Sequence, residues 1–254
     1  MRYTVPAIAA LLAVAPRVAH AQADAEYLFA PGVVSLSLFG GGIAFSDFRR
    51  EAEPIASDQP LERRLSARTS VLGAGALTYW LSSRWGIRLH ASYAPSRFEL
   101  KTADSGTLRE DVRTDAAPPL SRVDVWMYDA DVVFRIPLGV GRVEPYGILG
   151  AGAVDYRLRT AEGEMVPESV AIAFEGNRQR MLAGVIGLGA LVPLERHRLL
   201  LNFELTNHLG QTPLNEDALS TVAFDPESEQ RVDNVGYTSN VRLMLGLTIP
   251  LFSR

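Results

Sequence analysis

The chain has 254 residues, a formal net charge of −4 at pH 7 and no cysteine. This length suits one domain or at most two, and the mild acidity gives no support for nucleic-acid binding. The lack of cysteine excludes a disulfide-stapled fold, thiol catalysis and cysteine-based metal sites. We predict no metal site and no cofactor, because the four histidines are scattered and no His or carboxylate cluster has the spacing of metal ligands.

The first residues carry the pattern of a secretory signal peptide. Arg2 gives a positive start, residues 5–15 form a short apolar run, and A-H-A at residues 19–21 fits a small-x-small cleavage site. The apolar run is shorter than the about 20 residues that a membrane helix needs. We therefore expect residues 1–23 to be a signal peptide and residues 24–254 to form one mature domain.

Apolar and polar residues alternate over eight later segments, which is typical of strands whose two faces meet different surroundings. In the last segment, apolar residues occupy every second position from Val241 to Leu251. That length matches the about 9–11 residues with which a tilted strand crosses a bilayer. The predicted strands cover residues 33–47, 67–81, 85–100, 121–137, 143–158, 180–193, 199–209 and 236–252.

Short and long connections alternate between these segments. The short ones read S-S-R, G-V-G-R and E-R-H-R, and the long polar ones cover residues 48–66, 101–120, 159–179 and 210–235. This rhythm is typical of outer-membrane barrels, with tight turns on the periplasmic side and long loops outside. Because no later stretch is apolar enough for a membrane helix, a membrane location requires a closed barrel. The sequence thus predicts an all-β fold, an eight-stranded antiparallel up-and-down transmembrane β-barrel.

Aromatic residues lie near both ends of the predicted strands. We interpret them as two interfacial girdles around an aliphatic band, of the kind that membrane barrels carry. The girdle toward the short turns contains Trp80, Trp85, Tyr146 and Phe252, and the girdle toward the long loops contains Tyr93, Trp126, Tyr128 and Tyr156.

With this signal peptide, this eight-segment rhythm and the last strand N-V-R-L-M-L-G-L-T-I-P-L-F, the sequence resembles the small outer-membrane β-barrels. That family includes the transmembrane domain of outer membrane protein A and its compact relatives. The resemblance covers about residues 30–252. It implies a bacterial outer-membrane location after export through the periplasm, and recognition by the barrel-assembly machinery through a C-terminal aromatic residue. Phe252 is the candidate for this assembly signal, although Ser253 and Arg254 follow it.

The polar faces of the predicted strands carry charged residues that would point into the barrel. Unpaired charges are costly in a narrow, partly dry space, so we expect these residues to form a structural salt-bridge network. A small water-filled path, whose ion pairs exchange partners, is the alternative. The predicted interior network consists of Arg88, His90, Asp129, Asp131, Arg135, Glu144, Glu204 and Arg242.

From these features we expect a monomeric structural or surface-interaction protein that is not an enzyme. Its partners would be outer-membrane lipid and lipopolysaccharide, contacted by Arg-rich and acidic long loops that also have the composition of plain solvated loops. A narrow, porin-like channel for small solutes is the second hypothesis. A lipid A-modifying enzyme is a third, because His90 and Ser92 match the His-x-Ser spacing of the lipid A 3-O-deacylases, although Tyr93 stands where that family has Asn. A soluble periplasmic ligand-binding barrel is the fourth.

Overall fold

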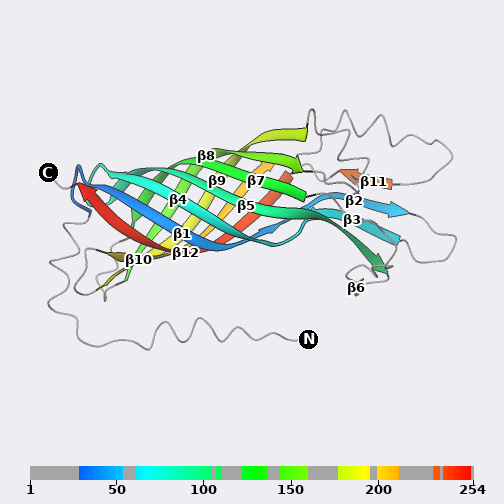
Figure 1. The fold of residues 1–254 in the computed structure, drawn as a ribbon, viewed down its shortest axis with the longest axis horizontal. Coiled ribbons are helices and arrows are strands. Elements are labelled where there is room, and N and C mark those ends of the chain that lie inside the picture. Colours follow the sequence, from blue (N-terminus) through cyan, green and yellow to red (C-terminus); the bar gives the residue numbers. More distant parts are fainter. Residues whose placement is uncertain are drawn as a thin grey trace.

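A computed structural model describes most of the chain, and its architecture is all β (Figure 1). The predicted signal peptide lies outside the described residues and stays a prediction. Among the described residues, no helix has the length and apolar character that a membrane crossing requires. The structure describes residues 29–53, 61–104, 107–109, 122–136, 143–159, 177–194, 199–211, 231–234 and 237–252.

Eight long antiparallel strands close into a barrel. Each strand pairs with its neighbour in the chain, and the first strand pairs with the last, so that the ring has no open edge. The predicted eight-stranded antiparallel barrel is therefore confirmed. Its strands are β1 (Val34–Phe45), β4 (Ser70–Trp80), β5 (Trp85–Asp104), β7 (Arg122–Arg135), β8 (Glu144–Arg159), β9 (Arg178–Pro193), β10 (Leu200–Gln211) and β12 (Tyr237–Phe252).

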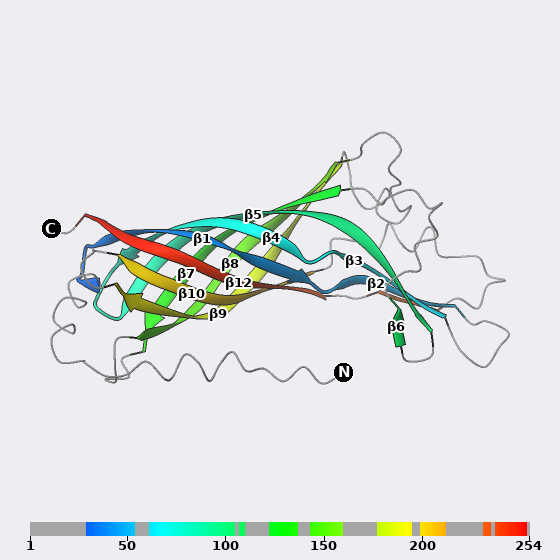
Figure 2. The same ribbon diagram turned by 60° about the horizontal axis from the view of Figure 1, so that its bottom comes forward.

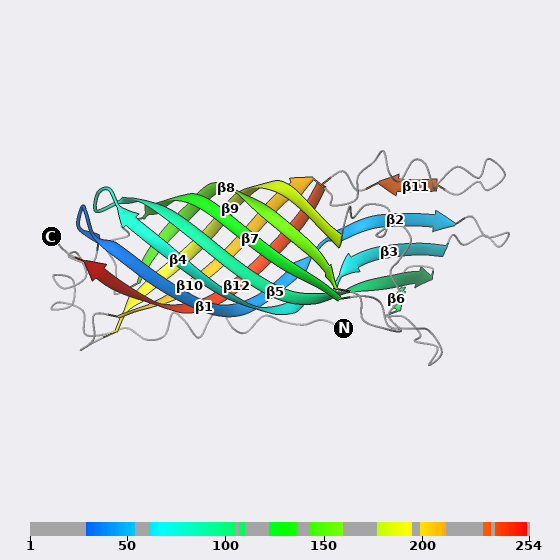
Figure 3. The same cartoon turned by 45° about the horizontal axis from the view of Figure 1, so that its top comes forward.

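Four further strands extend the sheet beyond one end of the barrel: β2 (Asp47–Glu53), β3 (Leu61–Ala67), β6 (Thr107–Arg109) and β11 (Arg231–Asn234). Figures 1 and 3 show β2, β3 and β11 continuing past the end that lies opposite the end of β12. The prediction of an irregular loop over residues 48–66 was wrong, because β5 runs past the barrel and gives β3 a strand to pair with. β11 pairs with β2, so the last long connection meets the first one through its backbone.

The outer wall of the barrel is apolar. Leu89 of β5 is 60% exposed and Leu243 of β12 is 66% exposed, and both alternate with buried polar neighbours. Soluble monomers rarely expose one large contiguous apolar surface, whereas a membrane barrel must. The wall around most of the ring is formed by Leu38, Leu77, Ile87, Leu89, Val132, Leu149, Ile186, Leu188, Leu205, Leu243, Leu245 and Leu247.

The interior is only partly ionic. A charged and polar middle lies between two apolar clusters, one of which contains Phe48, Phe98 and Tyr156, while the other contains Phe29 and Trp80. The girdle interpretation was therefore wrong for Trp80, Tyr146 and Tyr156, which are almost fully buried. Their position along the strand suits an interface, but their parity turns them inward. The wall does expose Trp85 and Tyr128, and Phe252 ends β12.

Glycines on β8 make room for the ionic middle. A Cβ atom added to Gly152 would lie 2.5 Å from Oδ1 of Asp129 and would also contact the carbonyl oxygen of Tyr128, while one added to Gly147 would meet nothing within 4 Å. We expect Gly152→Ala to lower the free energy of unfolding by about 1–3 kcal/mol, the usual cost of overpacking. Urea unfolding of vesicle-inserted protein measures this loss. Gly147→Ala is the control, and equal effects of the two variants would contradict the close packing on Asp129.

Candidate functional site

The centre of the barrel is organised around the carboxylate of Asp129 on β7. Its Oδ1 lies 2.6 Å from Nε2 of His208 on β10, and its Oδ2 lies 3.1 Å from Nδ1 of His90 on β5. Nη2 of Arg242 on β12 donates to Oδ2 at 3.0 Å. All four side chains are fully buried, so one carboxylate holds three nitrogen-bearing side chains from three different strands. We call these four residues the Asp129 centre.

The other two nitrogens of Arg242 also donate hydrogen bonds. Its Nη1 donates to Oγ of Ser92 at 2.9 Å, and its Nε donates to Oγ1 of Thr206 at 2.9 Å. A fully buried guanidinium needs nearly all of its N–H groups paired, because each unpaired group keeps its cost of removal from water. The Asp129 centre therefore spans the lumen and cross-links β5, β7, β10 and β12.

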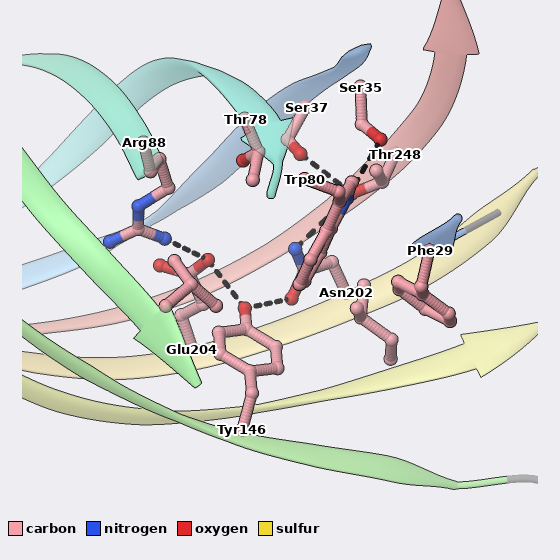
Figure 4. Close-up of a pocket in the computed structure, with 12 residues that line it drawn as sticks. Phe29, Ser35, Ser37, Thr78, Trp80, Arg88, Tyr146, Asn202, Glu204 and Thr248 are labelled. Carbon is pink, nitrogen blue, oxygen red and sulfur yellow. Dashed lines mark hydrogen bonds and ion pairs between the residues drawn. The ribbon is translucent and has the colours of Figure 1, made fainter. Parts of the chain in front are cut away.

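A second group of charges lies next to it, nearer the short turns. Arg88 of β5 donates through Nη2 to Oδ2 of Asp131 at 2.8 Å and through Nη1 to Oε1 of Glu204 at 2.6 Å. The hydroxyl of Tyr146 lies 2.6 Å from the same Glu204 oxygen and 2.6 Å from Oδ1 of Asn202. Figure 4 shows Arg88, Glu204, Tyr146 and Asn202 joined in one chain of contacts. We call Arg88, Asp131, Glu204 and Tyr146 the Arg88 centre.

A small cavity of about 20 Å³ lies between the Arg88 centre and the end of the short turns. That volume holds about one water molecule. Trp80 and Phe29 form its far side, with their ring centroids 5.0 Å apart (Figure 4). Arg135 stacks its guanidinium 3.7 Å from the Phe29 ring centroid and pairs with Glu144 at 2.9 Å. The mouth of the barrel is thus packed rather than open.

The structure places all eight residues of the predicted interior network inside the barrel or at its mouth. It divides them into the Asp129 centre, the Arg88 centre and the Arg135–Glu144 pair. Two members of these centres were missed. His208 follows Glu204 and Thr206 with the same parity, so the alternation of β10 contains the signal for it. Tyr146 belongs to the predicted girdle toward the short turns, and only its parity with buried Ile148 places it inside.

The His-x-Ser pair of β5 also faces the lumen. His90 contacts Asp129, and Ser92 accepts a hydrogen bond from Arg242. Both side chains are almost fully buried, so neither meets the apolar wall. A lipid acyl ester outside the barrel therefore lies on the opposite side of the sheet from this pair.

No family model and no curated protein matches this sequence. Several solved outer-membrane proteins have a similar fold at low sequence identity. The outer membrane protein OprG from Pseudomonas aeruginosa is 14% identical with a TM-score of 0.45, and the alignment covers 88% of this chain and 99% of that chain. The outer membrane protein AlkL is 13% identical with a TM-score of 0.46, covering 100% and 98%. The outer membrane protease OmpT from Escherichia coli is 9% identical with a TM-score of 0.40, covering 87% and 97%.

Proposed function

We propose that this protein is a closed, non-conducting β-barrel of the bacterial outer membrane with a structural or surface-interaction role. The observation that carries the proposal is the inverted distribution of side chains. Large aliphatic residues cover the outside, and buried charges cross-link the strands inside. A hydrocarbon surrounding stabilises such a wall, and the closed ring leaves no backbone hydrogen-bonding edge exposed to lipid.

The proposal includes the route to the membrane and the partners there. Residues 1–23 direct export through the periplasm, and the β12 strand ending at Phe252 is the segment that the barrel-assembly machinery recognises. The mature chain is a monomer in a Gram-negative envelope, in contact with membrane lipid and lipopolysaccharide. Deleting Phe252 and the two residues after it is expected to reduce outer-membrane insertion without reducing export, which fractionation of cells measures.

The packed lumen supports a barrel that does not conduct. Both centres span the interior, and the cavity beside the Arg88 centre has room for about one water molecule. We expect no single-channel steps when purified, refolded protein is inserted into planar bilayers. Heat-modifiable gel mobility of the same sample reports folding, and a known porin in the same bilayers is the control. A reproducible ion conductance of the wild-type protein would overturn this part of the proposal.

A narrow channel is the second candidate function, and buried unpaired atoms favour it. Among the described residues, Nε2 of His90, Nδ1 of His208, Oδ1 of Asp131 and Oε2 of Glu204 are buried without a hydrogen-bond partner. Such atoms usually bind water, and a channel would use them as a hydrated path through which ion pairs exchange partners. This hypothesis predicts conductance steps whose size changes in Glu204→Gln. A closed barrel predicts none in either protein.

An enzymatic role is not part of the proposal. The lipid A-modifying hypothesis rests on His90 and Ser92, and both are engaged in the lumen rather than in lipid. We expect the mass spectrum of lipid A to be the same in cells that express wild-type protein, His90→Ala or no protein. Loss of an acyl chain only with the wild type would instead establish a deacylase.

A soluble ligand-binding barrel predicts that the mature chain stays monodisperse without detergent.

A further inference from the structure

One carboxylate on the outer wall is completely buried. Asp155 of β8 alternates with the inward-facing Val154 and Tyr156, so its side chain points outward. Its two oxygens are covered by arginines from β8 and β9. Nη2 of Arg157 lies 3.1 Å away, Nε of Arg178 lies 2.7 Å away, and Nη2 of Arg180 lies 3.6 Å away.

Three guanidinium groups share this single carboxylate, so the cluster has a local charge of about +2. The side chains of Arg157, Arg178 and Arg180 remain 45%, 46% and 58% exposed, although the oxygens that hold them are buried. Each guanidinium has five N–H donors, and Asp155 accepts only a few of the fifteen. The cluster therefore presents many fixed donors to the outside. We call Asp155 and these three residues the arginine cluster.

The neighbours extend the cluster along the same side of the barrel. Arg159 of β8 pairs with Asp124 of β7, which also accepts a hydrogen bond from the Tyr93 hydroxyl at 3.0 Å. The guanidinium carbon of Arg157 lies 5.9 Å from the centre of the Trp126 ring. Aromatic rings beside cationic groups are typical of the level at which lipid headgroups lie.

The apolar wall begins directly next to the arginine cluster. Two residues beyond Arg180 on β9, Leu182 is 81% exposed, and Tyr128 on β7 is also exposed. The anionic head of a lipid would therefore contact the guanidinium donors, and its hydrocarbon tail would lie on the aliphatic wall below them.

The opposite side of the same rim is different. The outward residues of β10 and β12 at this end are uncharged: Asn207, Leu209, Gln211, Tyr237 and Ser239. The three arginines around Asp155 therefore have no charged counterpart among these outward residues of β10 and β12; Figure 2 shows β8 and β9 side by side in the barrel. A generally solvated rim would not concentrate its arginines around one buried acceptor.

We propose that the arginine cluster is a binding site for the phosphate groups of a phosphorylated lipid in the outer leaflet, whose acyl chains lie on the apolar wall below. This inference rests on the membrane location proposed above. Guanidinium forks bind phosphate oxygens in pairs, and they do so best where another group holds them in place. Asp155 is the positioning residue: it hydrogen-bonds Arg157 and Arg178, keeps Arg180 as an ion pair, and does not neutralise the three guanidinium groups.

Titration of refolded protein with bis-phosphorylated lipid A, followed by native mass spectrometry, tests this site. The comparison lipid is lipid A from which both phosphates have been removed. We expect the wild type to bind the phosphorylated lipid at least about tenfold more tightly than the comparison lipid. The variant Arg157→Gln/Arg178→Gln/Arg180→Gln/Asp155→Asn leaves no unpaired carboxylate and is expected to lose this preference. Arg84→Gln removes one arginine charge on the short turn at the opposite end of the barrel. This control variant is expected to keep the preference for the phosphorylated lipid.

Asp155→Asn alone separates recognition from folding. It keeps all three arginines but weakens the contacts that order them, so binding of phosphorylated lipid is expected to be weaker than in the wild type although the barrel still shows heat-modifiable mobility. Equal affinity for both lipids, or an unchanged preference in the fourfold variant, would overturn the site. Inorganic phosphate binding as tightly as the lipid would assign the cluster to a free anion instead. Failure of the wild type to insert into vesicles, checked by heat-modifiable mobility, would refute the membrane location and not the anion chemistry.

Discussion

Replacing Asp129 by Asn is expected to lower the free energy of unfolding more than the other single substitutions predicted for this barrel. The substitution keeps the shape of the side chain but removes the carboxylate that pairs with Arg242, the only one to do so in the part of the chain that the structure describes. A fully buried guanidinium then lacks a direct counter-charge, and breaking a buried pair in this way costs about 3–5 kcal/mol. Both His90 and His208 also lose a charged hydrogen-bond partner. Urea unfolding from lipid vesicles, followed by tryptophan fluorescence, measures the loss.

Asp124→Asn is the matched control for this experiment. Asp124 also pairs with an arginine, but Arg159 is 70% exposed and lies on the outer rim. Asp124 itself is buried, but its exposed partner is screened by solvent, so this variant is expected to lose less stability than Asp129→Asn. Similar losses in the two variants would mean that the Asp129 centre is hydrated and does not depend on the charge of this carboxylate.

Replacing Arg88 by Met has the second largest expected effect. Arg88 separates the carboxylates of Asp131 and Glu204, both of which are buried. Without the guanidinium, two like charges face each other in the lumen, and we expect a loss of about 3–5 kcal/mol in the free energy of unfolding. The same vesicle assay measures it.

Neutralising the whole Arg88 centre is expected to restore most of that loss. The triple variant Arg88→Met/Asp131→Asn/Glu204→Gln contains no buried charge at this site, and replacing a complete buried ion network is often neutral or stabilising. The three changes are thus expected to be strongly non-additive, because they share partners. A triple variant less stable than Arg88→Met alone would show that the three charges stabilise the barrel by more than mutual compensation.

The sequence predicts the barrel and its orientation well because both follow from local patterns. A period of two fixes which residues share a face, and short and long connections fix the order in which neighbouring strands pair. The eight strands lie within a few residues of their predicted bounds. The extension was missed because it depends on pairing across long distances: β3 forms where β5 continues past the barrel, which no alternation within residues 61–67 indicates.

The ionic interior was predictable as a set of residues but not as two centres. Parity places Arg88 and Asp131 inside, whereas their contact depends on the register between β5 and β7. A slip of that register by two residues would put Arg88 beside Asp129 or Val133 instead. Residue type favours the wall for Trp80 and Tyr146, whereas the alternation of their own strands turns both inward.

The arginine cluster was not visible as a site in the sequence. Asp155, Arg157, Arg178 and Arg180 belong to two strands separated by a long connection, and they meet only because Asp155 pairs with Arg180 in the ladder between β8 and β9. In the sequence, these residues are scattered charges at the ends of strands. Such charges are usually solvated, and only the buried acceptor between them indicates a different role.

The most direct test of the inside-out barrel uses two tryptophans at the same height. Trp80 is 3% exposed and faces the lumen, while Trp85 on the paired strand is 47% exposed on the wall. Two single-tryptophan proteins, each with Phe at the other two tryptophan positions, are inserted into vesicles whose lipids carry bromine near the headgroup end of the acyl chains. Strong quenching of Trp85 with little quenching of Trp80 is the expected result. Equal quenching of both, or a protein that stays in the buffer with neither residue quenched, would contradict a lipid-facing wall around an ionic core.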